Sequence, residues 1–201
     1  MKKFAVFGVA VFCILILQSS SNAQIIKFGI SGGLTNVTSP DPYKNDVSQN
    51  GYGFGSNLHF GAQARIDLPL VPINPILFVD YHLLRGEGNR SGTKINTSQN
   101  ILSIGAEGEY IILPLPFVKP YISLDVSLNK IGELKEESSV GTITQTGFTR
   151  YGGGIGAGAV ITILPVIDLD VSLKYQTLNL VGKTDGESNI SLINLNVAVI
   201  F

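Results

Sequence analysis

Apolar and polar residues alternate with a period of two along most of the chain after residue 24. In the segment 26–35, IKFGISGGLT, isoleucine, phenylalanine and leucine occupy one parity, and lysine, serine and threonine occupy the other. In the segment 102–110, LSIGAEGEY, aliphatic and aromatic residues alternate in the same way with serine, glycine and glutamate. Because successive side chains of a strand point to opposite faces of its sheet, this pattern predicts β-strands rather than helices.

Eight segments of this kind are separated by two sorts of connection. The alternating segments are 25–36, 52–67, 77–85, 102–111, 121–129, 150–165, 168–176 and 191–201. The connections 37–51, 86–98, 130–147 and 179–189 are long and polar, whereas 67–75, 113–118 and 164–167 are short and contain proline. This alternation of long and short connections predicts an all-β fold, an eight-stranded antiparallel up-and-down β-barrel with both termini on the side of the short turns.

The glycine-rich segment 150–165, RYGGGIGAGAVITILP, contains a match to the dinucleotide fingerprint G-x-G-x-x-G/A at 152–157. That fingerprint needs a strand before the glycines and a helix that begins at them. Here the glycines lie within the alternation, which continues through the β-branched residues of 160–163. We therefore interpret the segment as a strand with one nearly bare face and predict no nucleotide site.

Alternation alone does not decide whether the apolar face of the barrel points inward, as in a soluble lipocalin-like barrel, or outward to lipid. The polar parity is crowded with glycine, as the narrow interior of an eight-stranded barrel requires when long side chains fill it. Aromatic residues on the apolar parity resemble the girdle of a membrane barrel. They are Tyr52, Tyr81, Tyr110, Tyr151, Tyr175 and Phe201. These features favour a transmembrane barrel with an apolar exterior.

The first residues have the features of a secretory signal peptide. Two lysines precede an apolar run at 4–17, and small residues follow, with Ser21 and Ala23 at the positions that signal peptidase reads. The run is shorter than the roughly 20 residues of a spanning helix. We expect residues 1–23 to be cleaved and 24–201 to form the barrel domain. The single cysteine, Cys13, lies in the leader, so no disulfide or thiolate metal site is expected in the barrel.

Composition limits the partners of the chain. Of the 201 residues, 14% are charged, and the formal net charge is −1. Loss of Lys2 and Lys3 with the leader leaves 12 basic and 15 acidic residues, a net charge of −3. A weakly acidic chain without a basic stripe does not favour nucleic acid as a partner.

Charged residues on the inward parity are the candidate chemistry. They are Lys27, His59, Arg65, Asp80, His82, Glu107, Glu109, Asp125, Arg150, Asp168, Asp170 and Lys174. Basic and acidic members nearly balance, which favours a network of ion pairs that fills the barrel, because charges inside a protein must be paired or solvated. The alternative is that Glu107 and Glu109 form an acid/base pair or a cation site. We predict no cofactor, and no loop has the spacing of a calcium site.

The leader, the eight strands, the long loops opposite short turns and the terminal Phe201 together resemble the small outer-membrane β-barrel proteins grouped with the transmembrane domain of outer-membrane protein A, a set often labelled "porin family". The resemblance implies an outer-membrane location and contact with outer-membrane lipid. It also implies that Phe201 belongs to the signal read by the barrel-assembly machinery through the C-terminal strand.

Three functions remain open at this stage. The first is a structural or surface-interaction role, with a possible extracellular ligand bound by the long loops, since loops on a rigid scaffold often carry binding. The second is a small porin or a conduit for small or apolar solutes. The third is a lipid A-modifying enzyme, which would need a histidine close to a serine and an acid. Because His59 and His82 lie in the middle of predicted strands and no His-x-Ser pattern occurs, we do not expect an enzyme.

Overall fold

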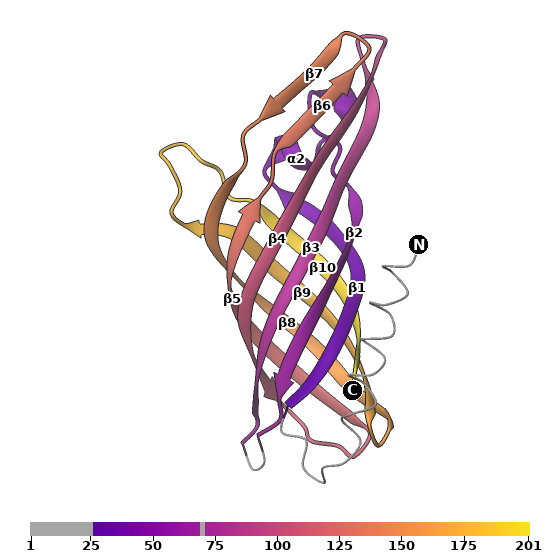
Figure 1. Cartoon of the computed structure of the whole chain (residues 1–201), viewed down its shortest axis with the longest axis vertical. Coiled ribbons are helices and arrows are strands. Elements are labelled where there is room, and N and C mark those ends of the chain that lie inside the picture. Colours follow the sequence, from indigo (N-terminus) through magenta and orange to yellow (C-terminus); the bar gives the residue numbers. More distant parts are fainter. Residues whose placement is uncertain (1–25, 69–70) are drawn as a thin grey trace, which may run out of the picture.

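The computed structural model describes residues 26–68 and 71–201, and it forms one closed β-barrel (Figure 1). The predicted leader, residues 1–23, lies outside the described residues. The barrel strands are β1 Ile26–Ser39, β2 Ser56–Ile66, β3 Ile73–Arg90, β4 Thr93–Ile111, β5 Val118–Ile131, β8 Phe148–Leu164, β9 Ile167–Val181 and β10 Ser191–Ile200. No helix in this part of the chain is long and apolar enough to cross a membrane.

Each strand of the barrel pairs antiparallel with its neighbours. The spatial order is β3-β2-β1-β10-β9-β8-β5-β4, and β3 also pairs with β4, so the sheet closes on itself. The first and last strands are joined, with Gly29 opposite Ile200. At the end of the chain the amide of Phe201 donates to the carbonyl of Phe28 at 2.8 Å, and Phe28 donates back at 2.9 Å. The prediction of an eight-stranded antiparallel barrel is confirmed.

The two faces of the barrel wall differ as the period of two predicts. On β5, Leu124 is 66% exposed on the outside, while its neighbours Ser123 and Asp125 are buried in the lumen. The same holds on β4, where Ile104 is exposed and Ser103 is buried. The exterior is therefore apolar and much of the interior is polar, which is the inverse of a soluble barrel and the arrangement of a membrane one.

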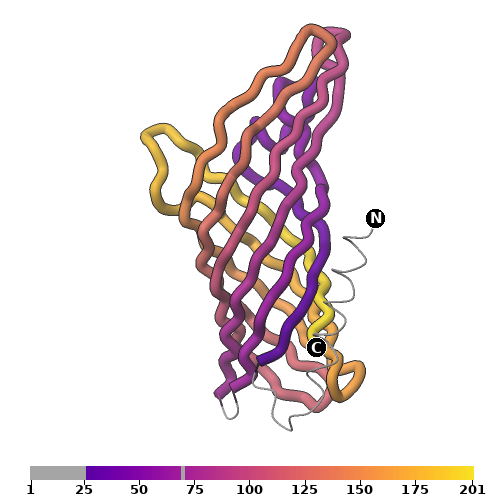
Figure 2. The backbone as a smooth tube through the Cα atoms, viewed as in Figure 1, coloured from indigo at the N-terminus to yellow at the C-terminus, as the bar shows by residue number. Residues whose placement is uncertain are grey.

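The barrel has two unlike ends, which we call the turn end and the loop end. The turn end holds the short connections 67–72, 112–117 and 165–166 and the C-terminus. The loop end holds the four long connections. Figure 2 shows the sheet continuing well beyond the barrel at one side of the loop end.

The connection 86–98, predicted as a long polar loop, is mostly strand. β3 continues to Arg90 and β4 begins at Thr93, so only Ser91 and Gly92 form the turn. Both turn residues have positive φ, 52° and 80°, which suits a tight hairpin whose twist matches its strands. The alternation was weak here because neither face of the hairpin faces lipid.

Two of the other three long connections also hold regular structure, and 182–190 holds no helix or strand. The connection 132–147 forms a second hairpin, β6 Leu134–Ser138 and β7 Gly141–Gln145, and β6 pairs with β4. The connection 40–55 contains α2, Asp41–Lys44, and a single 3-10 turn, Val47–Gln49. The loop end is therefore largely folded, although its composition predicted irregular loops.

Strand β2 begins four residues later than the sequence pattern predicted. The sequence pattern predicted a strand from Tyr52, with Tyr52 in an outward girdle, but β2 begins at Ser56. Gly53 has φ +68°, which breaks the extended backbone, and the two aromatic residues beside it turn toward the barrel mouth. Phe54 is buried, and the ring of Tyr52 lies 5.5 Å from that of Tyr43.

The even-numbered glycines of β8, from Gly152 to Gly158, face a filled lumen. A Cβ placed on Gly154 would lie 2.6 Å from Oδ2 of Asp125 and 2.6 Å from Cγ of Gln176. A Cβ on Gly158 would lie 2.6 Å from the hydroxyl of Tyr121. Contacts this short do not occur for real Cβ atoms. Glycine at these positions is therefore required by the long side chains that neighbouring strands send into the lumen.

This crowding predicts unequal effects on the two faces of β8. We expect Gly154→Leu to lower the free energy of unfolding by about 1–3 kcal/mol or more, because overpacking forces neighbours to shift. Ala157→Leu lies on the lipid-facing parity and serves as the matched control, with little expected change. Urea unfolding of refolded protein in lipid measures both. Equal losses would contradict this assignment of faces.

Candidate functional site in the lumen and at the loop end

The first ion cluster lies in the lumen at the turn end. Nζ of Lys27, on β1, lies 2.9 Å from Oδ2 of Asp67 and 2.9 Å from Oδ2 of Asp168. Thr162 donates from its hydroxyl to the other oxygen of Asp168 at 2.8 Å. The cluster links β1 to β9, because Lys27 and Asp168 lie 141 positions apart in the chain.

A second cluster, one layer deeper, is built around Arg65 of β2. Its guanidinium forms a buried ion pair with Glu109 of β4, and Nη1 lies 3.6 Å from Oδ2 of Asp170 on β9. The hydroxyl of Tyr121 donates to the other oxygen of Asp170 at 2.7 Å. Because these partners come from strands on different sides of the barrel, the cluster crosses the lumen and fills it.

The third cluster carries an excess of negative charge. Lys174 of β9 pairs with Glu107 of β4, and its Nζ lies 5.6 Å from the ring centroid of Phe78. Asp80 and Asp125 lie within electrostatic range of Lys174, but neither forms an ion pair within the described residues. One oxygen of Glu107 and one of Asp125 are buried without a protein partner. A single lysine therefore faces three carboxylates.

Both histidines lie in the lumen beyond this cluster. Thr35 contacts Nδ1 of His59 at 3.0 Å and Nδ1 of His82 at 2.8 Å, and it donates to Asn194 at 2.7 Å. Nε2 of His59 lies 3.1 Å from Oδ1 of Asn196. The histidines are thus held by neutral hydrogen-bonding groups and do not contact the ion pairs.

Arg150 is not brought together with the other predicted members of the charge network. It lies at the loop end, where Nη2 pairs with Oε2 of Glu187 at 2.7 Å, and its guanidinium carbon lies 4.7 Å from the ring centroid of Phe148. Hydrogen bonds from Arg150, with help from Asn179, lower the pKa of Glu187 to about 2. The pair therefore fastens the β9–β10 connection to the barrel wall.

Because Arg150 pairs with Glu187 at the loop end, the lumen holds one cation fewer than the inward parity predicted. The cations of the lumen clusters are Lys27, Arg65 and Lys174. The carboxylates on the inward parity are Asp80, Glu107, Glu109, Asp125, Asp168 and Asp170. Acidic groups outnumber basic ones, so water or protons must accompany the ion pairs.

An apolar cluster that the sequence pattern did not predict closes the lumen at the loop end. Its buried members are Val37, Phe54, Leu84, Ile101, Ile131, Leu134, Leu178, Ile190 and Leu192. Tyr43, Tyr52 and Phe148 pack against it. A signal was present, because apolar doublets such as 83–84, 101–102 and 192–193 break the alternation where both faces of the wall are apolar.

The sheet that projects at the loop end is formed by the ends of β3 and β4 together with β6 and β7 (Figure 1). This projecting sheet is hydrogen-bonded to the first long connection, 40–55. Arg90 of β3 donates to the carbonyl of Val47 at 3.2 Å, to that of Gly51 at 3.2 Å and to Oε1 of Glu136 on β6 at 2.8 Å. A Cβ on Gly88 would lie 2.8 Å from Cβ of Val47, so glycine permits this close packing. One arginine thus holds three segments of the loop end in a fixed arrangement.

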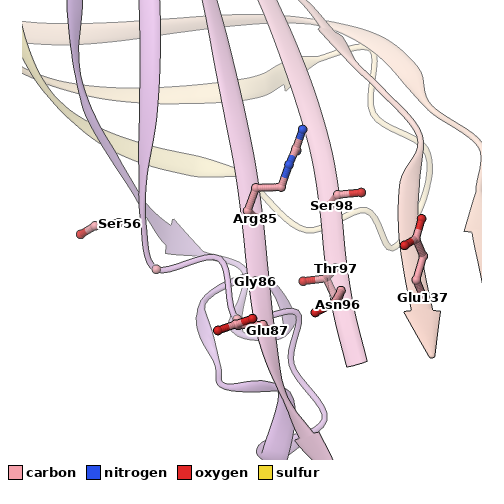
Figure 3. Close-up of a pocket in the computed structure, with 10 residues that line it drawn as sticks. Ser56, Arg85, Gly86, Glu87, Asn96, Thr97, Ser98 and Glu137 are labelled. Carbon is pink, nitrogen blue, oxygen red and sulfur yellow. The ribbon is translucent and has the colours of Figure 1, made fainter. Parts of the chain in front are cut away.

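An open pocket of about 630 Å³ lies beside this sheet (Figure 3). Its lining comes from β2, β3, β4, β6 and the end of the first long connection. The lining residues are Gly53, Gly55, Ser56, Arg85, Gly86, Glu87, Asn96, Thr97, Ser98 and Glu137. The pocket offers hydroxyl, amide and backbone groups together with one cation and two carboxylates, and it has no aromatic wall.

Among the described residues, no group of three or more histidine, aspartate or glutamate side chains is placed to hold a metal ion. A closed antiparallel barrel with an apolar exterior and an ion-paired interior defines a membrane-spanning β-barrel. Residues 7–201 match the family model described as outer membrane protein beta-barrel domain. The chain belongs to this family, and its location is the outer membrane.

Solved structures share the fold of this chain. Neisserial surface protein A shares 18% identity with a TM-score of 0.59, and the match covers 90% of this chain and 98% of that chain. Ail, the attachment invasion locus protein of Yersinia pestis, shares 19% identity with a TM-score of 0.50, over 87% of this chain and 98% of that one. A second Ail structure, in complex with the heparin analogue sucrose octasulfate, has a TM-score of 0.52 at 19% identity, over 88% and 99%. No curated protein sequence matches the chain significantly.

Proposed function

We propose that this protein is a non-conducting outer-membrane barrel whose loop end faces the outside and binds an external ligand. The observation that carries the proposal is the contrast between the two parts of the molecule. The lumen is filled by ion pairs and closed by the apolar cluster, whereas the loop end is an ordered sheet that projects beyond the barrel. A barrel closed in this way is suited to display a surface rather than to pass solutes.

The small-porin alternative is disfavoured by the same contacts. A solute would have to separate the pair of Arg65 with Glu109 and then pass between the buried side chains of Leu84, Ile101 and Ile131. Ions are excluded by an apolar constriction of this kind, since it offers no group to replace their water.

Conductance in planar lipid bilayers tests the closed lumen. We expect refolded protein to give no stable channels. As a positive control, the double variant Leu84→Ser/Ile131→Ser removes apolar groups from the closure and should raise the frequency of conducting events. Stable ion-conducting channels from the unmodified protein would contradict the proposal and favour the porin.

The chemistry of the loop-end pocket points to the class of ligand. Arg85 is accompanied by Glu87 and Glu137, so the pocket does not present an excess of positive charge. Ail of Yersinia pestis has been solved with a heparin analogue, but the likeness is one of fold, and the mixed charges here do not favour a polyanion. The hydroxyl, amide and backbone groups suit a neutral, hydroxyl-rich ligand such as a saccharide.

Binding to a glycan array tests the pocket. We expect the refolded protein to bind one or more neutral saccharides, and we expect Asn96→Trp, which fills the pocket, to reduce that signal at least tenfold. Thr144→Trp is the control, because Thr144 is exposed on β7 at the same end of the barrel, outside the pocket lining. Equal signals from the two variants would exclude the pocket as the binding site.

Two further parts of the proposal concern catalysis and assembly. The protein is not an enzyme, because His59 and His82 contact Thr35 and asparagine in a closed lumen that a lipid substrate does not reach.

Phe201 acts as part of the signal for the barrel-assembly machinery. Its support is its position at the end of β10, where it pairs with Phe28 and completes the seam of the barrel.

A further inference from the structure

The turn end of the barrel is apolar on its outer surface and at the tips of its turns. Phe117 is 73% exposed in the β4–β5 turn, and Val166 is 67% exposed in the β8–β9 turn. Ile112, Leu113 and Leu115 are also exposed. Hydrophobic side chains concentrated on turns that project from a fold indicate contact with another apolar phase.

Charge is nearly absent from this surface. The segments 112–118, ILPLPFV, and 161–167, ITILPVI, contain no charged residue. The nearby charges Lys27, Asp67 and Asp168 pair with one another at the lumen mouth, and Lys119, which follows the first segment, lies within electrostatic range of Asp168. The tips of these two turns thus carry no charged side chain of their own.

The backbone of the turns is also suited to a water-poor environment. Proline has no backbone N–H, so Pro114, Pro116 and Pro165 leave fewer donors that need a partner. The amide of Ile112 donates to the carbonyl of Pro120 at 2.9 Å, and that of Thr162 donates to the carbonyl of Phe117 at 2.9 Å. The first bond closes the β4–β5 turn and the second joins that turn to the end of β8, so both donors are satisfied within the protein.

The apolar turns continue the lipid-facing surface of the strands. On β8, the outward parity is apolar or glycine from Tyr151 to Ile163. Twelve residues at about 3.3 Å each, tilted by about 45°, rise about 28 Å, against an apolar band of about 25 Å in outer-membrane barrels. The turn that follows Ile163 therefore lies at the boundary between acyl chains and headgroups.

We infer that the turn end is a lipid-contacting surface whose short turns insert into the interfacial layer of the inner leaflet. The occupant is the lipid itself, because the surface is continuous with the strand belt that lipid already covers. Phe117 and Val166 insert among the acyl chains close to the headgroups.

Depth-dependent fluorescence quenching tests the inference, because the chain contains no tryptophan and each single variant reports one position. The reporters are Phe117→Trp and Val166→Trp in nanodiscs that hold one barrel each, which leaves both membrane faces accessible. Leu124→Trp, in the lipid-facing belt, and Val140→Trp, 89% exposed at the tip of the β6–β7 hairpin, are the membrane and water controls.

We expect blue-shifted emission from both turn reporters and strong quenching by lipids brominated close to the headgroup. Quenching by aqueous iodide should be at least threefold weaker than for Val140→Trp. Iodide quenching equal to that control would overturn the inference. A second outcome would also overturn the inference. If iodide quenches the turn reporters in single-barrel nanodiscs but not in vesicles crowded with the protein, a second copy of the chain, and not lipid, covers the turns.

Discussion

Replacing Lys174 by methionine is expected to lower the free energy of unfolding by about 3–5 kcal/mol, because removal of one partner from a buried pair leaves uncompensated charge. Lys174 is the cation that faces Glu107, Asp80 and Asp125 in the third lumen cluster. Its removal leaves three carboxylates close together without a positive charge. Urea unfolding of the refolded protein in lipid measures the loss, and water in the lumen would reduce it.

Replacing Glu107, the ion-pair partner of Lys174, distinguishes a cluster of several charges from a simple ion pair. We expect Glu107→Gln to cost less than Lys174→Met, since Asp80 and Asp125 remain to balance the lysine. The double variant should recover part of the summed loss, and a double-mutant cycle gives the coupling directly. If Glu107→Gln leaves stability unchanged and alters ion conductance, the lumen is a channel lining and the porin function replaces the one proposed.

Replacing Leu84 by alanine is expected to lower the free energy of unfolding by about 2–5 kcal/mol, the range for large-to-small changes in a packed core. Leu84 is fully buried in the apolar cluster at the loop end. Its loss leaves a cavity that the surrounding barrel wall cannot close, because backbone hydrogen bonds hold each strand in register. Urea unfolding again measures the change.

The neighbouring leucine is a matched control of the same type on the same strand. Leu83 lies on the outward parity of β3, where lipid replaces the lost side chain. We expect Leu83→Ala to cost less than half as much as Leu84→Ala. Similar losses would mean that Leu84 does not lie in a packed core, and the closure of the lumen would lose its support.

The charge network illustrates how far parity carries a prediction. Lys27, Arg65 and Lys174 were predicted to face inward from local alternation, and each lies in the lumen. Most of their partners, such as Glu107, Glu109 and Asp170, were not predictable, because they depend on the tilt and register of strands that are not adjacent. Arg150 has the inward parity as well, but it lies at the loop end and pairs with Glu187 of a connection.

The loop end was the least predictable part of the fold. The hairpin through Ser91 and Gly92 and the second hairpin β6–β7 have both faces away from lipid, so their sequences lack a strong apolar parity. The apolar cluster was missed for the opposite reason. At Leu84 and Ile101 the inward residue is as apolar as its outward neighbour, and alternation disappears where the lumen is packed.

The sequence by itself determined the eight barrel strands, their antiparallel order and, within those strands, which parity faces lipid and which faces the lumen, because side-chain direction along a strand is a local property with a period of two. Only the tertiary structure decided which inward side chains meet and where the lumen closes. Glu107 and Lys174 are 67 positions apart in the chain. They meet because closure of the tilted sheet brings β4 and β9 across one narrow lumen, and neither sequence segment carries that information alone.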